Sequence, residues 1–222
     1  MSFIETTPAE QARGETLAMY ERYQAMYGYI PNYAKVFCHR PQVMERWGRL
    51  LSAIRKPMTA RRFELATFAA AQALKNTYCS LAHGQALGNF LTAPGLRSLS
   101  NDEAEQPTTG TEQAIMSFAR KVAVDAAAIT RSDIESLRHA GLDDGEIFDI
   151  AATAAGRAFF TKILDALGVL ADSEYLAIDD DLRRSLTVGR PIDTGPTESL
   201  LPTRDSPGSG INGHSLNEIQ AR

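Results

Sequence analysis

The chain has 222 residues, 44% of them hydrophobic, which is enough apolar material for one large domain or two small ones. Its 27 acidic residues outnumber its 23 lysines and arginines, giving a formal net charge of −4, which argues against general affinity for nucleic acid. The start of the chain lacks the basic and apolar segments of an export signal, and no apolar run approaches the roughly 20 residues of a membrane helix. We therefore expect a cytoplasmic protein that binds neither nucleic acid nor membranes.

Helical patterns fill most of the chain, and almost no segment shows the alternation of a strand. Thr7 and Glu10, with Pro8 between them, form a capping-box pattern that predicts a helix reaching to about Tyr27. Further helices are expected at about 32–38, 41–56, 60–75, 78–91, 112–126, 131–140 and 143–168. The sequence therefore predicts an all-α fold.

The segments between and after these helices are rich in turn-forming residues. Residues 92–111 read as a long connection with a short helix near Gly95–Leu99. The run Asp179–Asp181 fits the acidic first turn of a short helix ending near Arg184 better than a metal site. Residues 193–222 contain too few apolar side chains to fold alone, so we expect a disordered tail there. We expect no metal and no cofactor.

Glu64 stands out because it is the only charged residue in the Ala-rich stretch Phe63–Leu74. That stretch is apolar nearly all round, which predicts a mostly buried helix. A buried carboxylate needs a partner or a raised pKa. An ion pair with Arg61 or Arg62 is one structural explanation, and a role in proton transfer is the functional one.

Cys79 follows 15 positions after Glu64, and His83 comes four residues later. With Thr77 as the expected N-cap, Cys79 falls in the first turn of a helix, where the helix dipole favours a thiolate. We therefore expect the pKa of Cys79 to lie below that of a free thiol. His83 lies one turn away on the same face and can exchange protons with the sulfur.

The second cysteine, Cys38, is expected to be a buried structural thiol. Free thiols at two positions fit a reducing compartment. A disulfide with Cys79 would require Cα atoms within roughly 7 Å of each other, and the sequence does not establish that approach.

Glu64, Tyr78-Cys79 and His83 resemble the E…C-x-[YH]-C-x-x-x-H signature of the AhpD-like alkylhydroperoxidase and carboxymuconolactone decarboxylase superfamily. These are all-helical proteins that assemble through their signature helices. The resemblance to the longer, peroxidase-related members spans about residues 10–192 and includes Ile30-Pro31-Asn32, His39-Arg40-Pro41, the segment 142–147 and Leu167-Gly168-Val169. It implies one helical domain over residues 1–192.

The resemblance also assigns roles. Cys79 matches the cysteine that attacks peroxide, and Glu64 and His83 match the proton relay. Asn76 stands where the redox members carry the resolving cysteine, so a local disulfide is impossible. The resemblance thus implies an external thiol reductant and a homo-oligomer.

A weak internal repeat accompanies this domain. Glu146, Thr161 and Asp165 repeat the spacing of the first-half residues, which suggests two duplicated helical halves at about 1–91 and 112–192. The second copy carries neither the thiol nor the imidazole, so we expect it to serve packing.

Three functions remain open from the sequence. The leading one is thiol-dependent reduction of alkyl hydroperoxides by Cys79, with Tyr78 at the entrance and Asn76 lining the substrate pocket. The runner-up is a non-redox lyase that acts on a small carboxylate or lactone through Glu64 and His83. Its anionic substrate could be attracted by a basic cluster, although a solvated basic face is the simpler explanation of that cluster: Arg55, Lys56, Arg61 and Arg62. The third is a non-catalytic helical oligomer.

Overall fold

The computed structural model describes residues 2–103 and 107–195. Within these ranges the secondary structure is helical, apart from an isolated bridge between Ala171 and Ile192, which confirms the all-α prediction. The α-helices are α1 Gly14–Tyr27, α2 Asn32–Val36, α3 Pro41–Arg55, α4 Ala60–Ala73, α5 Thr77–Leu87, α6 Ala93–Ser100, α7 Gly110–Asp125, α8 Arg131–His139, α9 Asp144–Ala166 and α10 Asp180–Leu186. Short 3₁₀ turns lie at Ala9–Gln11, Phe37–His39, Ala126–Ala128 and Ser173–Ala177.

The first helix begins later than the sequence predicts. A single 3₁₀ turn follows Pro8 without a side-chain cap, and α1 starts only at Gly14. Thr7 is engaged elsewhere, because its amide donates to Cys38 Sγ (3.3 Å) and its carbonyl accepts the Tyr20 hydroxyl (2.9 Å). Contacts with the core therefore override the local capping-box pattern.

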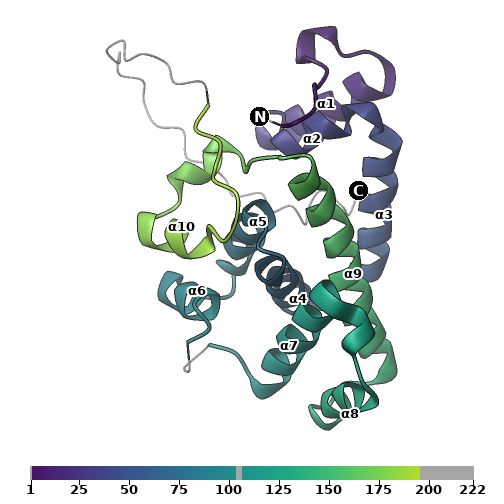
Figure 1. Ribbon diagram of the computed structural model, residues 1–222, viewed down its shortest axis with the longest axis vertical. Helices are drawn as coiled ribbons and strands as arrows, with labels where there is room; N and C mark the ends of the chain where they lie inside the picture. Colours follow the sequence, from purple (N-terminus) through teal and green to yellow (C-terminus); the bar gives the residue numbers. More distant parts are fainter. Residues whose placement is uncertain (1, 104–106, 196–222) are drawn as a thin grey trace.

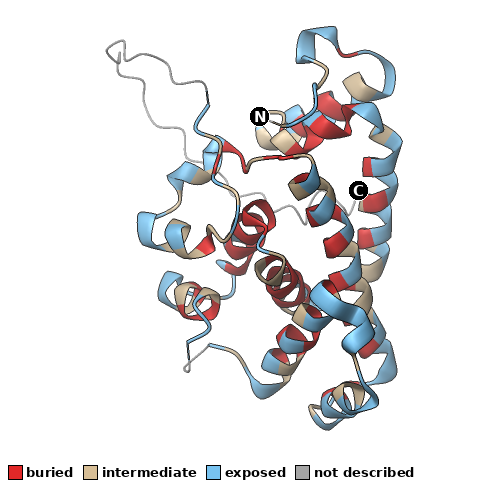
Figure 2. Cartoon of the chain, in the orientation of Figure 1, coloured by how far each residue is buried: buried red, intermediate tan, exposed pale blue. Residues whose placement is uncertain are grey.

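Helix α4 lies at the centre of the fold and packs against α5, α7 and α9. Figure 1 shows α3 running beside α9 along one edge, with α6 and α10 on the other side of α5. Every residue of α4 from Phe63 to Ala71 is buried, and Gln85 alone among the residues of α5 is exposed (Figure 2). The signature residues of the sequence therefore lie in the interior.

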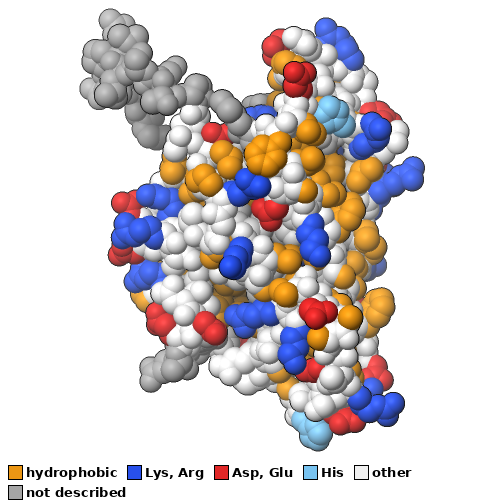
Figure 3. Space-filling model, in the orientation of Figure 1, with side chains coloured by type: hydrophobic (Ala, Val, Ile, Leu, Met, Phe, Trp, Pro, Cys, Tyr) orange, Lys and Arg blue, Asp and Glu red, His pale blue; other side chains and the backbone are white. Residues whose placement is uncertain are grey.

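The surface is mixed in charge. Figure 3 shows lysine and arginine side chains interspersed with aspartate and glutamate, without a large field of one sign on this face. In the part of the chain that the structure describes, the helices are too short or too polar to cross a bilayer.

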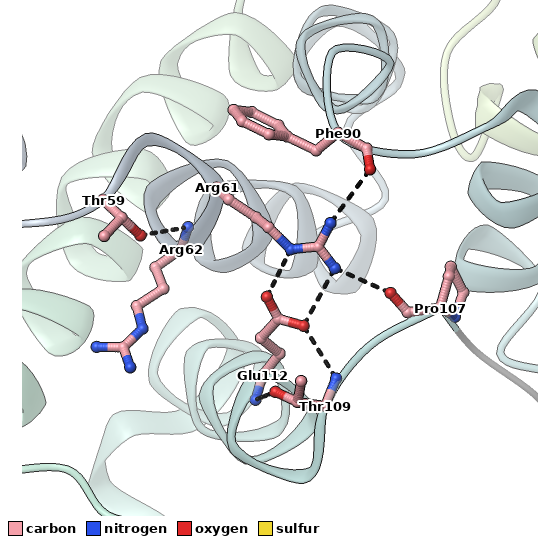
Figure 4. A network of polar contacts seen from close by, with 7 residues as sticks. All are labelled: Thr59, Arg61, Arg62, Phe90, Pro107, Thr109 and Glu112. Atoms are coloured by element: carbon pink, nitrogen blue, oxygen red, sulfur yellow. Dashed lines mark hydrogen bonds and ion pairs between the residues drawn. The ribbon is translucent and has the colours of Figure 1, made fainter.

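Figure 4 shows how the start of α4 is fixed to the start of α7. Arg61 binds Glu112 through two contacts, Nε to Oε1 at 2.6 Å and Nη2 to Oε2 at 3.1 Å. The same guanidinium donates to the carbonyls of Phe90 and Pro107, while Glu112 completes a capping box with Thr109. This network ties α4 to both connections that flank α6.

Two of the four members of the basic cluster expected around the start of α4 are paired with carboxylates. Arg61 pairs with Glu112, and Arg62 pairs with Glu146 at the start of α9. Neither arginine binds Glu64, so the ion pair considered from the sequence does not form.

The three positions that repeat the signature spacing lie on the single helix α9. Glu64, by contrast, lies on α4, whereas Cys79 and His83 lie on α5. Equal spacing therefore corresponds to different local structure, and the two-halves organisation stays a prediction.

The C-terminal segment folds back over the start of α5. Asp179 caps α10, which confirms the short helix predicted from the acidic run. Ser80 Oγ donates to the Leu186 carbonyl (2.6 Å), and the Gly189 amide donates to Thr77 Oγ1 (2.8 Å). We call residues 187–193 the C-terminal strap. Most of the predicted tail, residues 196–222, lies outside the described residues.

Candidate active site

The side chains of Glu64 and His83 form a buried pair between α4 and α5. Glu64 Oε2 lies 2.7 Å from His83 Nδ1, and each side chain is 1% exposed. The second carboxylate oxygen, Oε1, and the second ring nitrogen, Nε2, have no hydrogen-bond partner among the described residues. The pair thus presents one acceptor oxygen and one ring nitrogen that remain available for proton transfer.

Asn76, not Thr77, is the N-cap of α5. Its side-chain oxygen accepts the Cys79 amide at 2.8 Å, and asparagine is one of the preferred N-cap residues, whereas Thr77 Oγ1 accepts the Gly189 amide. Cys79 therefore lies in the first turn, as predicted, and His83 follows one turn later. The residue at the position of a resolving cysteine has a structural role here.

The prediction that the pKa of Cys79 lies below that of a free thiol is wrong. Cys79 is 1% exposed, and its burial raises the pKa of the thiol because the thiolate loses its hydration. The positive charge of Arg157 opposes this effect, and the carboxylate of Asp165 adds to it. The resting group is a thiol, and it needs a base to react.

Burial also lowers the pKa of His83, and Arg157 lowers it further, against the opposing effect of Glu64. The imidazole is therefore neutral at neutral pH. A neutral ring that donates Nδ1–H to the Glu64 carboxylate leaves its Nε2 lone pair free to accept a proton. His83 is in the protonation state that a general base requires.

Arg157 of α9 belongs to the same site. Its Nη1 lies 3.8 Å from Cys79 Sγ, and the residue is 2% exposed. The guanidinium carbon lies 5.4 Å from the ring centre of Trp47 and 5.7 Å from that of Phe160. A cation thus reaches the sulfur from a helix 78 positions further along the chain.

Arg157 is not among the candidates predicted from the sequence, although the sequence carries a signal for it. Arg157 is the only charged residue between Asp149 and Lys162, in an Ala-rich helix. Glu64 shows the same pattern, as the only charged residue in Phe63–Leu74. A lone charge within an apolar stretch of helix therefore marks both Glu64 and Arg157.

Tyr78, expected at the entrance of the site, is 2% exposed and donates its hydroxyl to Asp172. Asp172 also accepts the Asn32 amide (2.7 Å) and the Tyr29 hydroxyl (3.1 Å). Burial raises the pKa of Asp172 to about 6, against the opposing effect of these donors. The carboxylate joins the start of α2, α5 and the segment after α9.

We expect Asp172 to make folding stability depend on pH. Its pKa is about 6 in the folded state and near 3.8 in the unfolded state, so the folded state binds the proton more tightly. Stability from this group therefore increases by about 1 kcal/mol as pH falls from 7 to 5. Urea unfolding of wild type and Asp172→Asn at both pH values measures this change. The difference in free energy of unfolding between the two proteins contains the contribution of Asp172, whereas the opposite effect of His83 is present in both and cancels. An equal difference at both pH values would contradict the assignment.

Cys38 is 7% exposed and accepts the Thr7 amide, which confirms a buried thiol. Both cysteines are free. Among residues 2–103 and 107–195, no group of three histidine, cysteine, aspartate or glutamate side chains is arranged to hold a metal ion.

This arrangement of helices defines an AhpD-like fold. A peroxidase-related protein from Ralstonia eutropha JMP134, described as an alkylhydroperoxidase AhpD core, matches with a TM-score of 0.68 at 20% identity. The match covers 85% of this chain and 98% of that one. A peroxidase-related protein from Silicibacter sp. TM1040 matches with a TM-score of 0.61 at 21% identity, over 79% and 91% of the two chains.

The same fold occurs in the debrominase Bmp8. The C82A variant of that protein, in complex with 2,3,4-tribromopyrrole, matches with a TM-score of 0.63 at 14% identity, over 84% of this chain and 98% of that one. No protein-family model and no curated protein sequence matches this chain. At these identities the likeness establishes the fold alone.

Proposed function

We propose that this protein is a thiol-dependent, peroxidase-like oxidoreductase in which Cys79 attacks hydroperoxides and the Glu64–His83 pair transfers the proton. The observation that carries the proposal is the buried 2.7 Å contact between Glu64 and His83, one turn from the thiol. The likeness to peroxidase-related proteins supports it.

Charge balance supports the proton relay. In the resting site His83 is neutral and Cys79 is a thiol. His83 Nε2 makes no direct hydrogen bond to Cys79 Sγ, so the proton crosses through an intervening water or the bound hydroperoxide. Its arrival at Nε2 gives a thiolate and an imidazolium, and the net charge of the buried site does not change. The Glu64 carboxylate stabilises the imidazolium that forms, as an acidic partner does in a nucleophile–base–acid triad.

The reaction then balances as a two-electron oxidation of sulfur. The thiolate attacks the distal oxygen of the hydroperoxide, the O–O bond breaks, and Cys79 becomes a sulfenic acid. The imidazolium of His83 protonates the departing alkoxide, which leaves as an alcohol. The relay begins and ends in the same protonation state.

Regeneration requires two equivalents of an external thiol, because Asn76 occupies the resolving position. The first thiol condenses with the sulfenic acid, releasing water and forming a mixed disulfide. The second thiol attacks the reductant's sulfur in that mixed disulfide. Cys79 is released as a thiol, and the two reductant molecules leave joined by a disulfide. We further propose that the protein works as a homo-oligomer in the cytoplasm.

Brief exposure to hydrogen peroxide in the presence of dimedone tests this function. We expect a dimedone adduct on Cys79 in wild type, by peptide mass, and none at that position in Cys79→Ser. Cys38 serves as an internal control for general thiol oxidation. An adduct on Cys38 without one on Cys79 would contradict the proposal.

A second candidate follows from the raised pKa of Cys79. The Glu64–His83 pair can work as an acid–base pair on a small carboxylate or lactone without an ionised thiol. The debrominase structure shows that this fold can hold a small organic ring in another protein. Activity that survives Cys79→Ser and disappears in Glu64→Gln would favour this lyase reaction.

A further inference from the structure

Arg157 is a buried cation that has no carboxylate partner among the described residues. An arginine stays charged at any physiological pH, and an unpaired charge in the interior is costly. Its Nε has no hydrogen-bond partner in the described part of the chain, and its Nη1 contacts Cys79 Sγ. Glu64 is engaged with His83 instead. The site therefore contains a positive charge that still needs an anion.

Two aromatic rings fix the guanidinium in place. Trp47 and Phe160 stack on each other with ring centres 4.2 Å apart, and both lie within cation–π distance of Arg157. The Trp47 indole N–H donates to the Gly156 carbonyl (3.1 Å), which locks α3 against α9 beside the arginine. The positive charge is held at the sulfur by packing, so little side-chain freedom remains to be lost when an anion forms.

We propose that Arg157 is a further catalytic residue, the counter-charge that stabilises the thiolate of Cys79 when the Cys79 proton moves to His83. This inference rests on the proposed function for its purpose, but its physical content concerns only the ionisation of Cys79. One S–H bond breaks and one N–H bond forms, and no electron is transferred. Arg157 stabilises the thiolate, and Glu64 stabilises the imidazolium against the opposing positive charge of Arg157, so each charge formed in the step has an oppositely charged partner.

The proposal explains how a fully buried cysteine can react. The start of α5 provides a helix dipole, but burial outweighs it, and the pKa of Cys79 is raised. A guanidinium in contact with the sulfur acts at short range in a low-dielectric interior, where a charge interaction is strongest. Arg157 is therefore the group that keeps the thiolate attainable.

Titration of Cys79 tests this role without any substrate. The thiolate absorbance in the ultraviolet is measured against pH, and the curve of Cys79→Ser is subtracted. In Arg157→Met we expect the pKa of Cys79 to rise by about one unit or more, a tenfold smaller thiolate fraction. Arg157→Lys should restore most of this shift. Lys162→Met, which removes an exposed positive charge from the same helix, should leave the titration unchanged.

A folded Arg157→Met variant with an unchanged Cys79 titration would overturn the inference. If that variant fails to fold, a second pair keeps the test decisive. With Arg157 present, Cys79→Asp should melt no lower than Cys79→Asn at pH 7, because the new carboxylate has a cationic partner. A much lower melting temperature for Cys79→Asp would also overturn it. Failure of the peroxide reaction with an intact pKa response would refute the proposed function alone.

Discussion

Glu64→Gln should reduce turnover at least about 100-fold, the usual contribution of a general acid–base group, while the protein stays folded. Glutamine keeps the volume and can still accept the His83 Nδ1–H, but it carries no charge to stabilise the imidazolium. Transfer of the thiol proton to His83 then becomes less favourable, because the imidazolium that forms has no carboxylate partner. Turnover and the melting temperature should be measured on the same preparations.

Glu112→Gln is the matched control, because Glu112 is also a buried glutamate but its partners are Arg61 (2.6 Å) and Thr109 rather than His83 or Cys79. We expect it to lower stability by about 2 kcal/mol, since it breaks a charge-assisted contact, and to leave activity per folded molecule unchanged. Arg61 holds the pKa of the Glu112 carboxyl below its usual value, which agrees with a stabilising contact. If instead Glu64→Gln loses stability and keeps its activity per folded molecule, Glu64 is structural.

Gly189→Ala should destabilise the protein by about 3 kcal/mol, at the upper end for an overpacked site. A Cβ atom at this position would lie 1.8 Å from the Lys75 carbonyl oxygen, a backbone atom that cannot rotate away. The C-terminal strap must therefore move off the start of α5 and give up the Gly189 contact with Thr77. Urea unfolding gives the stability change.

Displacement of the strap should also expose the start of α5, so we expect faster alkylation of Cys79 by iodoacetamide, followed by peptide mass. Gly48→Ala is the control, because a Cβ there has no neighbour within 4 Å. Gly48 lies inside helix α3, where alanine should stabilise by about 0.5–1 kcal/mol without affecting Cys79. Equal stability of the two alanine variants would show that the strap adapts freely.

The sequence by itself determined most of the helices, because their apolar periodicity and caps are local properties of the chain. It also determined that Cys79 and His83 share one face of a helix, since four residues make about one turn. Glu64 could be singled out as a lone charge in an apolar stretch, but its partner could not be chosen, because Arg61 and Arg62 were equally near in sequence. Residue spacing alone does not determine which side chain contacts Glu64.

The tertiary structure decided which charges meet. Because α4 packs against α5, Glu64 contacts His83. Arg61 and Arg62 instead pair with Glu112 of α7 and Glu146 of α9. Packing of α9 against the centre brought Arg157 to Cys79 from 78 positions away. The predicted direction of the Cys79 pKa shift is wrong because it, too, depends on tertiary packing. A helix start is visible in the sequence, whereas the burial that removes water from the thiol depends on every element packed around it.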